Sequence, residues 1–82
     1  IMKQIANILI DYGFDFDYEN RNSNGETITA HQLDLKVSTH QGTVFFEHDG
    51  KTLEFEENVE TFNRLRSRTE KILISETSSF ED

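Results

Sequence analysis

The chain has 82 residues, a net charge of −8 and no cysteine. This length predicts one domain, near the small end of what folds alone, and the absence of cysteine excludes disulfides and thiolate metal sites and favours a reducing cytoplasm. The charge opposes direct binding to nucleic acid or anionic lipid and favours basic protein surfaces; the alternative is that it only keeps a small protein soluble. No apolar run approaches the ~20 residues that span a bilayer.

The first predicted element is a helix over residues 2 to 12. Its apolar residues recur at helical spacing and form one stripe, made of Ile1, Ile5, Ile8, Leu9 and Tyr12. Gly13 follows where a left-handed C-cap is favoured. The stripe predicts a helix that packs on a sheet.

Strict alternation of aromatic and acidic residues predicts a strand over residues 14 to 19. A period of two puts Phe14, Phe16 and Tyr18 on one face and Asp15, Asp17 and Glu19 on the other. The polar residues 20 to 25 then form a loop, which we interpret as a flexible hairpin connection. The alternative is a recognition loop held by a rigid scaffold.

Three further strands are expected, over residues 27 to 39, 43 to 48 and 51 to 55. Gln41-Gly42, or the slightly longer turn Thr39 to Gly42, connects the first two. Asp49-Gly50 is a strong two-residue hairpin signal between the last two, and we take the two-residue form of both turns to derive the registers. The second turn pairs Phe46 with Leu53, and the first pairs Val37 with Phe46.

Both turns therefore predict the same two faces of the sheet, which a one-residue slip would destroy. The predicted core face consists of Leu33, Leu35, Val37, Val44, Phe46, Leu53 and Phe55. The predicted outer face consists of Asp34, Lys36, Ser38, Thr43, Phe45, Glu47, Thr52, Glu54 and Glu56.

The last predicted element is a helix over residues 58 to 75, with Asn58 as N-cap and Glu60 in the first turn. Its expected buried stripe is Val59, Phe62, Leu65, Thr69, Ile72 and Leu73. Residues 76 to 82 are expected to form a flexible acidic tail. The elements predict a single two-layer α+β domain over residues 1 to 75, with both helices on one face of an antiparallel meander of three to four strands.

No pattern of catalytic or metal-binding residues is recognisable. His31, His40 and His48 lack the close spacing of zinc ligands, and a shallow sheet offers no cleft to raise a carboxyl pKa. We therefore expect no enzyme activity, cofactor or metal. The Arg64, Arg68 and Lys71 helix face could track phosphates, but a solvated basic face near the helix C-terminus is the favoured interpretation.

Phe45 is predicted on the outer face, with Ser38 across one strand boundary and Glu54 across the other. An exposed aromatic ringed by carboxylates is typical of a protein-binding anchor within a polar rim. The competing interpretation is that a tail, a loop or a second copy covers it.

The layout resembles the small acidic anti-CRISPR proteins of phages that block the type II effector nuclease. The resemblance covers residues 3 to 65 and lies in Ser23-Asn24 to Ile28-Thr29, in Leu33-Asp34-Leu35-Lys36-Val37 and in Asn58-Val59-Glu60-Thr61-Phe62. This chain differs by an additional strand over residues 51 to 55 and by its one C-terminal helix. The resemblance implies that carboxylates stand in for DNA phosphates in a basic groove.

The hypothesis from the sequence is a non-enzymatic, phage-encoded inhibitor that occupies a basic, nucleic-acid-binding protein surface. The candidate contact residues are Asp34, Phe45, Glu47, Glu54 and Glu56, joined by Asp15, Asp17 and Glu19 if the first strand lies in the same sheet with that orientation. The alternative is a small structural or adaptor domain that forms a homodimer, or binds protein, through its open sheet face.

Overall fold

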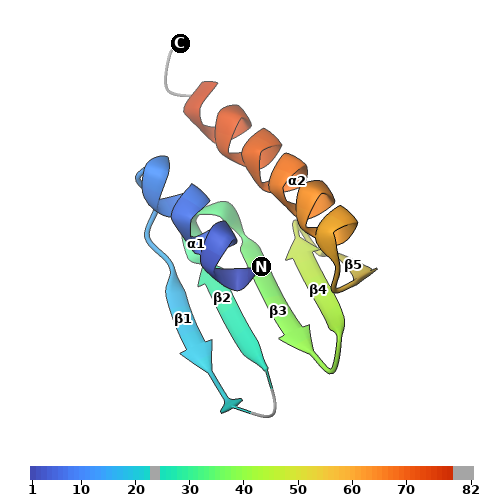
Figure 1. Ribbon diagram of the computed structural model, residues 1–82. Coiled ribbons are helices and arrows are strands. Elements are labelled where there is room, and N and C mark those ends of the chain that lie inside the picture. The colour runs from blue at the N-terminus through green and yellow to red at the C-terminus, as the bar shows by residue number, and fades with distance from the viewer. Residues whose placement is uncertain (23–24, 79–82) are drawn as a thin grey trace.

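The computed structural model describes residues 1–22 and 25–78, which form a five-stranded antiparallel sheet and two helices (Figure 1). The elements follow the chain as α1 (Met2–Asp11), β1 (Asp17–Asn20), β2 (Glu26–Ala30), β3 (Leu35–His40), β4 (Thr43–His48), β5 (Lys51–Glu56) and α2 (Val59–Ser78). Each strand pairs with its neighbour in the chain, in the order β1-β2-β3-β4-β5. The α+β class and the element order are confirmed, and the sheet has five strands rather than three to four.

The additional strand arises because residues 27 to 39, predicted as one strand, form two. A short 3₁₀ turn at His31–Leu33 follows β2, and Asp34 adopts a left-handed backbone with φ of 50°. The chain reverses there, so Ile28 pairs with Val37. Leu33 is nevertheless buried at 3% exposure, which is why the apolar alternation continues through the turn and resembles an unbroken strand.

Both predicted hairpin turns are confirmed. Gln41 and Gly42 have φ of 48° and 82°, and Asp49 and Gly50 have φ of 52° and 76°. Positive φ at both central residues is the type I′ geometry that matches the twist of the flanking strands. Phe46 accordingly pairs with Val37 on one side and with Leu53 on the other, as the sequence predicts.

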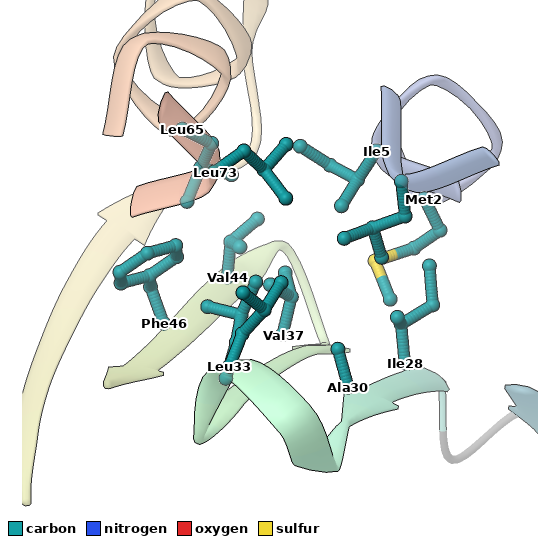
Figure 2. Close-up of a cluster of buried hydrophobic side chains, with 12 residues drawn as sticks. Met2, Ile5, Ile28, Ala30, Leu33, Val37, Val44, Phe46, Leu65 and Leu73 are labelled. Atoms are coloured by element: carbon teal, nitrogen blue, oxygen red, sulfur yellow. The ribbon is translucent and has the colours of Figure 1, made fainter. Parts of the chain in front are cut away.

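The hydrophobic core lies between one face of the sheet and both helices. In Figure 2, side chains from α1 and α2 point towards the strands, and side chains from β2, β3 and β4 point back at them. The helices supply Met2, Ile5, Leu9, Leu65 and Leu73, while the sheet and its 3₁₀ turn supply Ile28, Ala30, Leu33, Leu35, Val37, Val44 and Phe46. The opposite face of the sheet receives no helix from the described part of the chain (Figure 1).

Three predictions of core residues are wrong. Tyr12, at the end of the predicted α1 stripe, is 42% exposed. Leu53 points to the helix side but is 36% exposed, because β5 is an edge strand with no further described strand beside it. Val59 is 78% exposed, whereas Thr61 is buried at 4%. The buried residues of α2 recur every four positions, starting at Thr61 and continuing with Leu65. In the first turn, the side of the helix that faces the core is therefore that of Thr61 and not that of Val59.

The start of α2 agrees with the prediction, since the backbone N–H of Thr61 donates to Asn58 Oδ1 at 2.9 Å. The helix continues to Ser78, three residues further than predicted. The expected tail therefore begins inside the helix, and its last four residues lie outside the described part of the chain. Residues 23 and 24 of the predicted loop also lie outside it.

Candidate protein-binding face

The strand registers place a defined set of side chains on the uncovered side of the sheet, because directly paired residues point to the same side. One row across all five strands is Asp17, Thr29, Lys36, Glu47 and Thr52, and the next is Glu19, Thr27, Ser38, Phe45 and Glu54. A third row adds His40, Thr43 and Glu56. We call these three rows the open face.

The open face is negatively charged. It carries the carboxylates of Asp17, Glu19, Glu47, Glu54 and Glu56. Two cations, Lys36 on the face and Arg21 beside its edge, oppose them, so five charges minus two leave −3 with histidine neutral. Asp17 and Glu19 thus join the sheet in the orientation on which their predicted role depended.

Three of these carboxylates have basic side chains as neighbours. Glu19 lies 3.0 Å from Arg21, Asp17 lies 3.2 Å from His31, and Glu47 lies 3.9 Å from Lys36. All three pairs are exposed, so each contributes little to stability and can exchange its partner.

Glu54 and Glu56 differ from them, because neither forms an ion pair with any described residue. Both lie on β5 and both are exposed. The most available negative charge of the open face therefore lies along the β5 edge of the sheet.

Phe45 lies within the open face and is half-buried. As predicted, Phe45 pairs with Ser38 on β3 and with Glu54 on β5. An aromatic side chain between neighbouring strands offers apolar surface that only a partner can bury completely.

Two predicted site residues lie elsewhere. Asp34 is not a strand residue, because its left-handed backbone belongs to the connection before β3. It borders a hollow of about 320 Å³ at the end of the open face, together with Lys36 and Glu47. Asp15 precedes β1 and is exposed, so it is not part of the paired rows.

The sequence analysis did not identify a contact at the β1 edge. The Tyr18 hydroxyl donates a hydrogen bond of 2.6 Å to Glu26 Oε1, and this bond to a carboxylate raises the pKa of the phenol. Tyr18 lies opposite Ile28 on the helix side of the sheet and is 49% exposed. The sequence could have indicated this hydrogen bond only by a tyrosine and a glutamate on neighbouring strands. Recognising them as neighbours requires the β1–β2 register, which the sequence analysis did not predict.

The basic residues of α2 are partly neutralised within the helix. Arg64 pairs with Glu60 at 2.7 Å and Arg66 with Glu70 at 3.1 Å, each one turn away. Arg68 instead lines a hollow of about 200 Å³ with Phe46 and Leu53. Paired side chains of this kind fit the solvated basic face better than a phosphate track.

Within residues 1–22 and 25–78, no three histidine, aspartate or glutamate side chains are grouped to hold a metal ion, and no helix is long and apolar enough to cross a membrane. Comparison with protein-family models, curated proteins and solved structures found no match. The function of this chain is therefore inferred from its own geometry.

Proposed function

We propose that this protein is a non-enzymatic binding protein whose open face occupies a basic, nucleic-acid-binding surface of another protein. The observation that carries the proposal is the collection of five carboxylates on one uncovered sheet face around the half-buried Phe45. A face of this charge attracts basic surfaces over a Debye length of about 8 Å at physiological salt and accelerates their encounter.

The spacing of the carboxylates supports a role as substitutes for phosphates. Asp17 and Glu19, like Glu54 and Glu56, lie two residues apart on one strand, or roughly 6.8 Å. That length is about two axial rises along one strand of DNA. The two pairs lie on the opposite edge strands, four strand spacings or roughly 19 Å apart.

Phe45 gives the proposed face an apolar contact within this charged surround. Interfaces commonly depend on a buried aromatic anchor, while charged residues at the rim mainly steer association. We therefore assign affinity chiefly to Phe45 and association rate chiefly to Glu54 and Glu56.

In its narrower form, the proposal is a phage or mobile-element inhibitor of the anti-CRISPR kind that acts in the cytoplasm. It is supported by the resemblance in layout, by the acidic face and by the lack of cysteine. The partner would then be a nucleic-acid-binding effector.

The test compares two double variants of equal charge. Glu54→Lys with Glu56→Lys reverses the free carboxylates of the open face, while Asp11→Lys with Glu76→Lys reverses two exposed acids on the helices, away from it. Each changes the net charge by +4, from −8 to −4. A partner is first captured from host lysate and identified by mass spectrometry, and its association rate is then measured with each variant at low and high salt.

We expect the open-face variant to slow association at least about tenfold at low salt, and the control variant to retain most of the rate. A nucleic acid ligand of the partner should compete with the unmodified protein. Equal effects of the two variants, or simultaneous binding of nucleic acid, would contradict the proposal. Association that is insensitive to salt would instead favour the adaptor interpretation.

A further inference from the structure

The outer edge of β5 exposes unpaired backbone groups. The N–H of Glu57 donates to the carbonyl of Gly42 at 2.9 Å, directly after the pairing of Glu56 with Thr43. Residues of an antiparallel strand alternate between bonding to one neighbour and facing away from it. Leu53 therefore bonds towards β4, whereas the N–H and C=O groups of Thr52 and Glu54 and the N–H of Glu56 point away from the sheet. The carbonyl of Glu56 accepts from the N–H of Asn58 at 3.0 Å, so the open edge ends there.

The side chains of β5 offer different chemistry on its two sides. Glu54 and Glu56 lie on the open face and form no ion pair with a described residue. Leu53 and Phe55 lie on the helix side, where Leu53 is 36% exposed and Phe55 is partly buried against the core. A strand added to this edge would meet carboxylates on one side and apolar groups on the other.

The other edge of the sheet lacks this combination. Strand β1 is four residues long, and its carboxylates Asp17 and Glu19 already have His31 and Arg21 as neighbours. On its helix side, Tyr18 is bonded to Glu26 within the sheet. The β5 edge is six residues long and has no proline to block pairing.

We propose that the β5 edge binds an extended segment of the partner by strand addition, and that basic and apolar residues alternate in this segment. Its basic side chains lie beside Glu54 and Glu56, and its apolar side chains cover Leu53 and Phe55. Main-chain hydrogen bonds provide affinity and the alternating side chains provide selectivity. This inference rests on the proposed function, since it describes how the same basic partner is held.

A second copy of the chain fits this edge less well. Each copy carries a charge of −8, and two paired β5 strands would bring the carboxylates of Glu54 and Glu56 together on the open face. A basic strand has the complementary charge.

The probe is a capped synthetic peptide of alternating lysine and valine, compared with a peptide of the same composition in which all lysines precede the valines. Binding is measured by calorimetry, and amide hydrogen exchange of the protein is followed by NMR. We expect the alternating peptide to bind about tenfold more tightly and to protect the amides of Thr52, Glu54 and Glu56. The two peptides carry equal charge, so attraction to acid alone does not distinguish them.

A matched pair of variants isolates the backbone contribution. Thr52→Pro removes one outward N–H without breaking a bond to β4, and Thr52→Val retains it; both leave the net charge unchanged. The proline variant should lose the tenfold preference and the valine variant should keep it. If the proline variant does not fold, amide exchange of the unmodified protein still tests the proposal, because strand addition should protect the outward amides of β5 when the alternating peptide is bound.

Binding of both peptides with equal affinity and without protection of these amides would overturn strand addition while leaving the proposed function intact. Failure of both peptides to bind would overturn both proposals. Sedimentation of the protein alone measures its oligomeric state. A dimer that Thr52→Pro dissociates would show that the β5 edge binds a second copy, and would overturn the proposal of a basic segment.

Discussion

Neighbouring phenylalanines on β4 provide a direct test of the sheet registers. Phe46 is 3% exposed within the core, and Phe45 points to the open face. Truncation of a buried phenylalanine to alanine costs about 3–5 kcal/mol. At about 0.05–0.15 kcal/mol per residue, the free energy of unfolding of this 82-residue domain is roughly 4–12 kcal/mol. Phe46→Ala should therefore remove a large part of it.

Phe45→Ala should lower the free energy of unfolding by only about 1 kcal/mol, because part of its side chain already contacts water. Urea titration followed by circular dichroism measures both changes. The slope for a small domain is about 1–3 kcal/mol per molar urea, so Phe46→Ala should move the midpoint by one molar or more. A larger loss from Phe45→Ala would refute both the registers and the assignment of the open face.

Three further substitutions test other parts of the fold by thermal and urea unfolding. Thr69→Val should raise the free energy of unfolding by about 1 kcal/mol, because the buried Thr69 hydroxyl has no hydrogen-bond partner among the described residues; a clear loss would mean that it has one. Gly25→Ala should destabilise strongly, since a Cβ would overlap the Thr39 carbonyl and φ is 105°; a neutral effect would contradict this β1–β2 turn geometry. Asn58→Ala should cost about 1 kcal/mol and Asn58→Asp much less, and equal losses would show that the cap bond to Thr61 is unimportant.

The hairpins could be predicted from the sequence because their turn chemistry is local. Glycine at the second turn position and alternation on both sides define a two-residue loop, and each loop determines the register of its strands. The break at residues 31–34 could not be predicted in this way, because no glycine marks it. Asp34 adopts the left-handed backbone, and Leu33 keeps its place in the apolar alternation while belonging to a turn.

The candidate site was predictable to a similar degree. The faces of Phe45, Glu47, Glu54 and Glu56 follow from the two hairpins and are confirmed by the registers. The neighbour of Glu47, Lys36, also follows from the Gln41-Gly42 register. The contact of Asp17 with His31 depends on how β1 pairs with β2, which no spacing in the sequence indicates. The exposure of Leu53 depends on the place of β5 at the edge of the sheet, and that is a tertiary property.

The sequential order of the strands has a kinetic consequence. Because every strand pairs only with its neighbour in the chain, the sheet contains mostly short loop closures, which lowers the contact order and favours folding on the order of milliseconds. Contact between α1 and α2 joins the first helix of the chain to the last. During synthesis, α1 can already pack on β2 and β3, but the part of the core that α2 covers stays exposed until this last helix is made. That apolar surface is what a chaperone or protease would bind.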